Sequence, residues 1–337
     1  MTASSVLNDA GELRRILYLL ALARAFEARV LALVSDGSIR GTTHPYVGQE
    51  AVAVGACMAL RPDDWVVSTH RGHGHLLAKG GDPNRLMAEL FGKAGGYGGG
   101  KGGTQHMADF AVGFLGSNGI TGGGIPIATG AALSAQMRAS GQVVVAFFGD
   151  GAANQGTFHE SLNLAALWHL PVVYVCENNL YAMSTSVREA CAVEHIAERA
   201  AAYAIPGVQA DGMDVLAVDA AMRPALERAR AGRGPTLIEC KTYRFLGHSK
   251  SDQRLYRQRE EEAAWRARDP IARLRHAALE HGPLDSADLD AIARDASASV
   301  DAAVAFARQS PFPTADAVSD GVFSDAETTP VSLRCAS

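Results

Sequence analysis

The stretch "VVVAFFGDGAANQGTFHE", from Val143 to Glu160, joins an apolar run to a Gly-Asp-Gly turn and then to a helical pattern. An apolar run without alternation predicts a strand that is covered on both faces, which is typical of parallel sheets. A glycine turn between such a strand and a helix is typical of a phosphate-binding loop. Asp150, however, places a negative charge where a phosphate would bind. The carboxylate therefore needs its own explanation.

Strand and helix patterns alternate on both sides of this stretch. The alternation predicts an α/β fold with a doubly wound, mostly parallel sheet and helical N- and C-terminal extensions. We expect one domain over residues 1–315 and a weakly patterned tail over 316–337 that is prone to disorder. The predicted strands cover about 65–69, 143–148, 172–176, 207–210 and 236–245. The predicted helices cover about 9–35, 119–138, 155–169, 192–203 and 214–231, one that starts near 49, and a helical region over 255–309.

Composition limits the class of protein. The 337 residues carry a net charge of -5, with a pI of about 6.1, and 47% are hydrophobic. This balance gives no indication of nucleic-acid or membrane-surface binding. No apolar stretch reaches the roughly 18 residues that would span a bilayer, and the N-terminus lacks the pattern of a signal peptide. The five cysteines form no CxxC pair, which favours reduced thiols in the cytoplasm.

Two familiar phosphate loops fit the sequence poorly. The run "GGYGGGKG", which begins at Gly95, has the glycine and lysine spacing of a P-loop, but Gly102 stands where the metal-binding Ser or Thr belongs. No strand precedes it. The run "GDGAAN" supplies two glycines of a dinucleotide fingerprint, but Asn154 replaces the third. Neither motif explains Asp150.

A metal-bridged diphosphate does explain it. A hard divalent cation takes oxygen ligands and can sit between a carboxylate and a phosphate. The next predicted strand ends in "ENN", so Asn179 would lie at the same edge of the sheet as Asp150. Open α/β sheets bind their ligands at this carboxyl edge. Both motifs could instead be simple turns, but this alternative does not explain why each follows the end of a predicted strand.

The pair of motifs, Gly-Asp-Gly at 149–151 and Glu-Asn-Asn at 177–179, resembles the thiamine diphosphate signature. The longer run is similar to the α subunit of the thiamine diphosphate-dependent first (E1) component of 2-oxo acid and acetoin dehydrogenase complexes. The resemblance covers about residues 10–310. It includes "HPYVGQEAVAVG", "STHRGHGHLLAKGGD", "GKGGTQHM" and "TYRFLGHSKSD".

The resemblance implies a site for thiamine diphosphate and Mg²⁺. Asp150, Asn179 and the backbone carbonyl of Tyr181 would be the metal ligands. His44 and His248 would be catalytic residues of the substrate pocket. The implied cofactor contacts are His70, Arg71, Gly119, Thr121, Asp150, Gly151, Ala152, Asn179, Tyr181, Met183, Arg244 and His248, and Ser249 and Asp252 would belong to the loop that closes over the cofactor.

The same resemblance implies partners. In this family a separate β subunit supplies the glutamate that activates the cofactor's pyrimidine ring, and no residue of this chain matches that role. The chain would therefore be inactive alone and active in a heterotetramer of two α and two β chains. The acyl product would pass to a lipoyl-bearing acyltransferase component.

Two motifs disagree about the substrate. "ITGGGIPIATG", from Ile120, resembles acetoin-type members, whereas "GHSKSD", from Gly247, resembles the pyruvate-type loop. His70 also stands where the pyruvate branch commonly has Tyr. We expect an acetoin dehydrogenase α subunit, with a pyruvate or branched-chain 2-oxo acid dehydrogenase as the alternative. A chain that only docks a partner is a further alternative, which Asp150, Asn179 and His44 disfavour. A nicotinamide oxidoreductase is another, which Asn154 and the "ENN" motif disfavour.

Overall fold

A six-stranded parallel sheet forms the centre of the molecule in a computed structural model that describes residues 3–320. The strand order is β2-β1-β3-β4-β8-β7, and every pairing between neighbours is parallel. The predicted doubly wound α/β fold is confirmed. The strands are β1 (Trp65–Val67), β2 (Phe114–Gly116), β3 (Val144–Gly149), β4 (Val172–Asn178), β7 (Gly207–Asp211) and β8 (Thr236–Lys241), and β5 (Tyr181–Ala182) pairs with β6 (Thr185–Ser186) in a separate hairpin.

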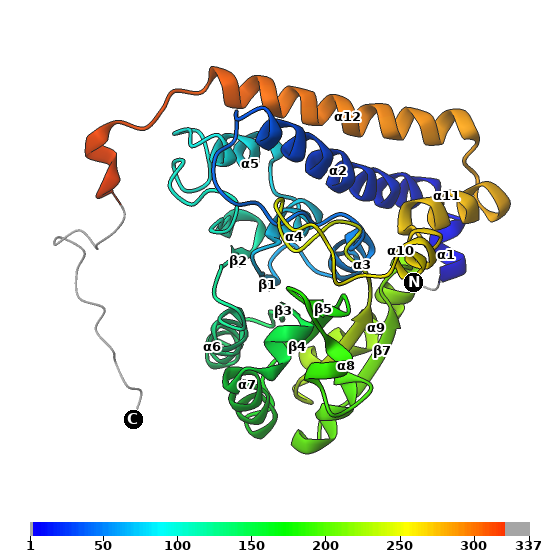
Figure 1. Cartoon of the computed structure of the whole chain (residues 1–337). Coiled ribbons are helices and arrows are strands. Elements are labelled where there is room, and N and C mark those ends of the chain that lie inside the picture. The colour runs from blue at the N-terminus through cyan, green and yellow to red at the C-terminus, as the bar shows by residue number, and fades with distance from the viewer. Residues whose placement is uncertain (1–2, 321–337) are drawn as a thin grey trace.

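Both faces of the sheet are buried, because successive side chains of a strand point to opposite faces. Val145 and Phe147 of β3 pack into one core cluster, whereas Val144, Ala146 and Phe148 pack into another. This explains why the strands read as unbroken apolar runs. Figure 1 shows the two layers, with α2 and α12 on one side of the strands and α6 and α7 on the other.

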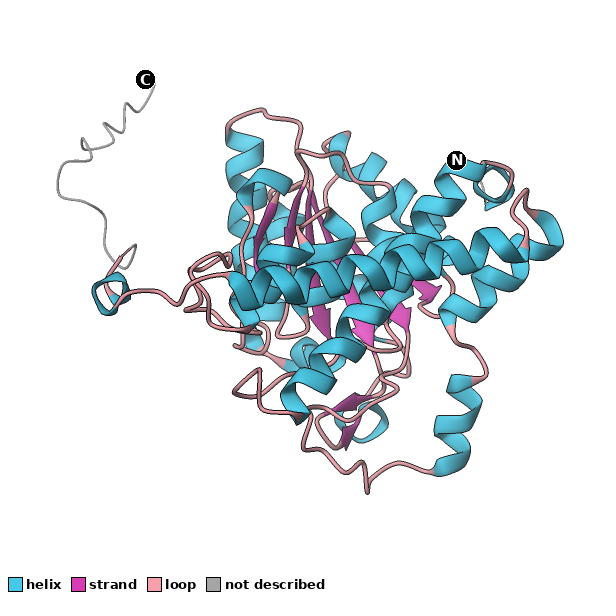
Figure 2. Ribbon diagram, turned by 90° about the horizontal axis from the view of Figure 1, so that it is seen from above, coloured by secondary structure: helices cyan, strands magenta, loops and turns pink. Residues whose placement is uncertain are grey.

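The helices belong to these layers and to the two extensions. Seen from above, the long helices α2 and α12 lie over the strands (Figure 2). The helices are α1 (Ala3–Leu7), α2 (Ala10–Ser35), α3 (Glu50–Met58), α4 (Gly72–Lys79), α5 (Pro83–Leu90), α6 (Gly124–Met137), α7 (Gly156–Leu167), α8 (Val187–Ala190), α9 (Val215–Arg230), α10 (Arg259–Arg266), α11 (Pro270–His281) and α12 (Ser286–Gln309). Short 3-10 helices cover Phe110–Val112, Asp150–Asn154, Ile196–Tyr203 and Ala315–Val318.

Several predicted elements are different in the structure. The helix predicted over 192–203 is a 3-10 helix from Ile196 that follows the short α8. Strand β8 ends at Lys241, so the rest of the predicted strand is loop. Helix α4 has no sequence signal because its glycines disfavour a helix. Tertiary packing requires them: a Cβ on Gly74 would lie 2.2 Å from the Tyr46 ring.

The glycine-rich loop after α5 binds a carboxylate of the chain itself. Glu89 is fully buried, and its two carboxylate oxygens accept hydrogen bonds from the backbone N–H groups of four glycines at 2.6–3.2 Å. The four are Gly98, Gly100, Gly102 and Gly103. An anion-binding arrangement of amides is therefore present in the loop, although the P-loop interpretation was rejected, and a side chain fills it. The loop has no free amides for a phosphate at these positions.

We expect Glu89→Ala to destabilise the chain by about 2–4 kcal/mol. A buried N–H without a partner costs about 1–3 kcal/mol, and the loop can recover part of the loss by turning toward water. Urea unfolding measures the change. Glu280→Ala, at an exposed position of α11, is the matched control and should stay within about 0.5 kcal/mol of wild type. Equal stability of the two variants would contradict the assignment.

The first residues of the predicted tail contact the same loop. The Lys101 ammonium donates to the carbonyl oxygens of Ala317 and Asp320, at 3.2 and 2.7 Å. The Lys93 ammonium lies 3.7 Å from the centre of the Phe312 ring. The rest of the predicted tail, 321–337, lies outside the described residues.

Candidate active site

A cavity of about 310 Å³ lies at the carboxyl edge of the sheet. Its walls come from residues that end or follow β1, β3 and β4, within 68–71, 147–152 and 177–183. Strands β2 and β3 lie on opposite sides of β1, so the order of the strands reverses between β1 and β3. Ligands of open α/β sheets bind at such a point, and the volume is within the range of small-molecule sites.

The cavity is lined by every predicted cofactor residue except Gly119. They come from the loops after β1, β3, β4 and β8 and from the turn before α6. His44 is not part of the lining, but its ring packs edge-on against the rings of His70 and His248, which are. The predicted residues on the wall are His70, Arg71, Thr121, Asp150, Gly151, Ala152, Asn179, Tyr181, Met183, Arg244 and His248.

Two of the three predicted metal ligands accept hydrogen bonds from the side chain of Arg244. Arg244 donates from Nε to the Asn179 amide oxygen at 3.1 Å and from a terminal nitrogen to the Tyr181 carbonyl at 3.0 Å. The Asn179 amide nitrogen donates to Gln49 Oε1 at 3.2 Å, which turns the amide oxygen toward Arg244. No sequence motif pointed to this role of Gln49. Amide and carbonyl oxygens held in this way suit a hard divalent cation.

Asp150 is the third predicted ligand and is 3% exposed. Burial raises the pKa of its carboxyl to about 6, although its hydrogen bonds and the charge of Arg244 act in the other direction. A buried carboxylate of this kind gains from a bound cation, because the cation stabilises the ionised form. The oxygen set of Asp150, Asn179 and Tyr181 therefore fits Mg²⁺.

Arg71 supplies positive charge to the same wall. One terminal nitrogen donates to the Pro45 carbonyl at 2.8 Å and the other to the His248 carbonyl at 2.7 Å. Burial and the neighbouring Arg244 lower the pKa of Arg71 to about 9, which leaves it charged at neutral pH. A guanidinium held between two loops in this way fits a diphosphate oxygen.

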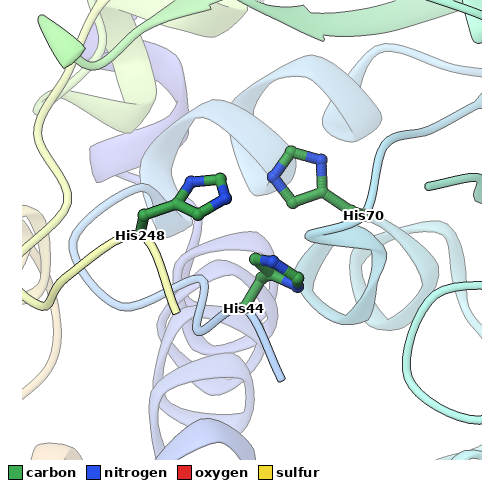
Figure 3. A group of neighbouring side chains, drawn as sticks. All are labelled: His44, His70 and His248. Atoms are coloured by element: carbon green, nitrogen blue, oxygen red, sulfur yellow. The ribbon is translucent and has the colours of Figure 1, made fainter. Parts of the chain in front are cut away.

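Three imidazoles, those of His44, His70 and His248, lie close together (Figure 3). The ring centres of His44 and His70 are 4.7 Å apart, and those of His44 and His248 are 4.9 Å apart. Burial, with added repulsion from Arg71, lowers the pKa of His44 to about 4, of His70 to about 2 and of His248 to about 3. The three rings are therefore neutral at pH 7. Each can donate one hydrogen bond and accept one.

The loop after β4 is shaped to border the cavity. Leu180 and Met183 have positive φ angles of 73° and 53°, an uncommon conformation for residues with side chains. A Cβ on Gly151 would lie 2.6 Å from the Cβ of Ala182, so this close approach requires glycine. Met183 remains 64% exposed at the edge of the cavity.

A buried polar network lies behind the cavity wall. The Tyr46 hydroxyl donates to Glu177 Oε1 at 2.5 Å and lies 3.2 Å from His75 Nε2. Ser68 Oγ lies 2.8 Å from the other ring nitrogen of His75. Each of these groups is buried. The network holds Glu177 in place, and sequence reasoning missed it because its members are far apart in the chain.

The loop after β8 is ordered by Asp252. Its carboxylate accepts hydrogen bonds from the His248 N–H and the Tyr256 hydroxyl, both at 2.6 Å. The buried Arg257 donates to the carbonyl oxygens of Arg244 and Leu246 at 2.7 and 3.0 Å. Together these contacts fix the backbone from which His248 reaches the cavity. Ser249 Oγ lies 3.3 Å from Ser251 Oγ.

Known proteins resemble this chain over most of its length. The α subunit of acetoin:2,6-dichlorophenolindophenol oxidoreductase from Bacillus subtilis is 49% identical over 291 residues, which cover 86% of this chain and 87% of that one. The protein of the same description from Cupriavidus necator is 46% identical with the same coverage. The α subunit of the pyruvate dehydrogenase E1 component from Rhizobium meliloti is 47% identical over 255 residues, 75% of this chain and 73% of that one.

Within the described residues, no helix is both long and apolar enough to cross a membrane.

The family model described as the dehydrogenase E1 component matches residues 18–316. That match spans nearly all of the sheet, the cavity and the helical extensions. The chain therefore belongs to the dehydrogenase E1 component family, as its two cofactor motifs predicted.

Proposed function

We propose that this chain is the α subunit of an acetoin dehydrogenase that uses thiamine diphosphate and Mg²⁺. The family depends on thiamine diphosphate. The observation that carries the proposal is the cavity itself, in which Asp150, Asn179 and Tyr181 present oxygens beside the cationic Arg71. A diphosphate with a divalent cation needs both kinds of group. When bound, the cofactor would supply a nucleophilic carbon that adds to the carbonyl carbon of the substrate, so that the neighbouring carbon–carbon bond can break.

The chain's own residues would have separate roles. Asp150, Asn179 and the Tyr181 carbonyl hold the metal, and Arg71 orients the diphosphate. Gly151 and Ala152 offer backbone N–H groups after β3, and Thr121 and Met183 contact the organic part of the cofactor. His44 and His248 hold the substrate oxygen, and they do so as neutral hydrogen-bond partners because both are uncharged at pH 7. Arg244 supports the metal ligands through its two hydrogen bonds to them.

The proposal includes a β subunit in a heterotetramer of two α and two β chains. Exposed apolar side chains at and near the edge of the cavity support a partner there: Ile120, Ile127 and Met183 are 74, 53 and 64% exposed. Soluble monomers seldom leave clustered apolar side chains exposed. The acyl group would then pass to a lipoyl-bearing acyltransferase. A cytoplasmic location agrees with the four free cysteines of the described residues, Cys57, Cys176, Cys191 and Cys240.

Acetoin is the proposed substrate because two relatives that cover 86% of the chain carry that name. The alternative is a pyruvate or branched-chain 2-oxo acid dehydrogenase, which the 47% identical Rhizobium meliloti relative and the "GHSKSD" loop favour.

Dye-coupled oxidation by the chain co-purified with its β partner tests the substrate. Acetoin, pyruvate and branched-chain 2-oxo acids are offered in turn with thiamine diphosphate and Mg²⁺. We expect kcat/KM for acetoin to exceed that for each acid by at least about tenfold, a transition-state difference of about 1.4 kcal/mol. A higher value for pyruvate or a branched acid would replace the acetoin assignment with the alternative.

A further inference from the structure

Gln105 contacts His44, the imidazole that packs against His70 and His248. The Gln105 amide nitrogen lies 3.3 Å from His44 Nδ1. An amide nitrogen only donates hydrogen bonds, so His44 Nδ1 is the acceptor. In a neutral imidazole the proton then lies on Nε2. The contact selects one of the two tautomers of His44.

The surrounding loop holds Gln105 in this position. The Gln105 carbonyl accepts a hydrogen bond from Ser117 Oγ at 2.8 Å. Ser117 Oγ in turn accepts one from the Met107 N–H at 3.0 Å. On the other side, a Cβ at Gly119 would lie 2.5 Å from Gln105 Oε1. Gly119, which is also predicted to contact the cofactor, leaves the amide room to reach His44.

Burial keeps His44 neutral, and the charged groups around it act in the same direction. The charged and titratable neighbours are cations or imidazoles, and among the described residues that act on it none is a carboxylate. A neutral ring with one fixed proton is a directional hydrogen-bond donor. These neighbours are His70, Arg71, His73, Arg244 and His248.

We propose that Gln105 is a positioning residue that fixes the Nε2–H tautomer of His44, so that His44 donates a hydrogen bond to an oxygen of the substrate. The inference rests on the proposed function, in which His44 faces substrate. It adds a residue outside the cavity lining and assigns His44 as donor. The backbone of the loop, anchored on Glu89, supplies the rigidity that the contact needs.

Gln105→Glu tests this through a reversal of the tautomer. A carboxylate accepts from Nδ1–H, which removes the proton from Nε2, and we expect kcat/KM at pH 8 to fall about 10²-fold. The carboxylate also raises the pKa of His44 by about 1–3 units. Below that pKa the ring carries both protons, and Nε2–H is restored. The ratio of variant to wild-type kcat/KM should therefore rise at least tenfold between pH 8 and pH 5.5.

Gln105→Leu separates this effect from simple loss of structure. It removes the bond without adding charge, so both tautomers are populated and kcat falls about two- to threefold at every pH. Gly119→Ala, which displaces the amide, should behave in the same way. Thiamine diphosphate should bind to both Gln105 variants with a Kd within about threefold of wild type. Gln309→Glu, which adds the same charge at the exposed end of α12, should match wild type throughout.

Either of two results would overturn the inference. One is the same pH-independent loss in Gln105→Glu and Gln105→Leu, and the other is wild-type kcat in Gln105→Leu. Wild-type turnover in the same assay keeps the proposed function separate. If the wild-type pair oxidises neither acetoin nor a 2-oxo acid, the proposed function fails. If it does and the variants show no reversal, only the tautomer assignment fails.

Discussion

Replacing Asp150 with Ala weakens the binding of thiamine diphosphate by about 10²- to 10³-fold and removes turnover at ordinary cofactor concentrations. The estimate follows from the 2–5 kcal/mol, roughly, that is lost when one partner of a buried charge pair is truncated. Asp150 is buried at the end of β3, and its carboxylate is the only anionic member of the predicted metal-ligand set. Isothermal titration of the cofactor in the presence of Mg²⁺ measures the loss.

Asp150→Asn distinguishes charge from shape. It keeps an amide oxygen as a ligand but removes the negative charge. We therefore expect it to bind thiamine diphosphate more weakly than wild type and more tightly than Asp150→Ala. Asp290→Ala, at an exposed position of α12, is the matched control and should bind as wild type does. Binding by Asp150→Ala within about threefold of wild type would show that the carboxylate does not hold the cation.

The chain without its β partner should have less than about 1% of the turnover of the co-purified pair. Among the described residues that line the cavity, the only carboxylates are Asp150 and Glu177. Asp150 is assigned to the metal, and Glu177 accepts a hydrogen bond from the Tyr46 hydroxyl behind the wall. Neither is free to serve as the acid that the pyrimidine ring needs. General acid–base groups contribute about 10²- to 10⁴-fold, so the missing partner should be decisive.

Titrating the β chain into the α chain in the dye-coupled assay measures this dependence. Turnover should rise with added β chain and reach a plateau at one β chain per α chain. The β chain alone should also be inactive, since the metal ligands belong to the α chain. Turnover by the α chain alone above about one tenth of the plateau would contradict a shared site. It would mean that a carboxylate of this chain activates the pyrimidine ring.

The sheet and much of the site could be predicted because their signals are local. Asp150 and Asn179 each follow an apolar strand directly, so their meeting at one edge follows from parallel pairing. Helix α4 could not be predicted, because tertiary packing around Gly74 overrides its weak helix propensity.

Contacts between distant segments left no signal of this kind. Glu89 and its glycines are read in sequence as an acidic helix end and a flexible loop, and only the folded chain brings the carboxylate to the amides. The same holds for Gln49, which orients Asn179, and for Gln105, which reaches His44. Several elements of the fold separate Gln49 from Asn179 and His44 from Gln105.

Magnesium dependence tests the central claim most directly. Thiamine diphosphate is titrated calorimetrically into the metal-free α–β pair, first without Mg²⁺ and then with it. If Asp150, Asn179 and Tyr181 hold a cation that bridges to the diphosphate, Mg²⁺ should tighten binding by at least about 10²-fold, and Asp150→Ala should remove that gain. Equal affinity with and without the metal would mean that the diphosphate is bound without a bridging cation, and the explanation of Asp150 would be wrong.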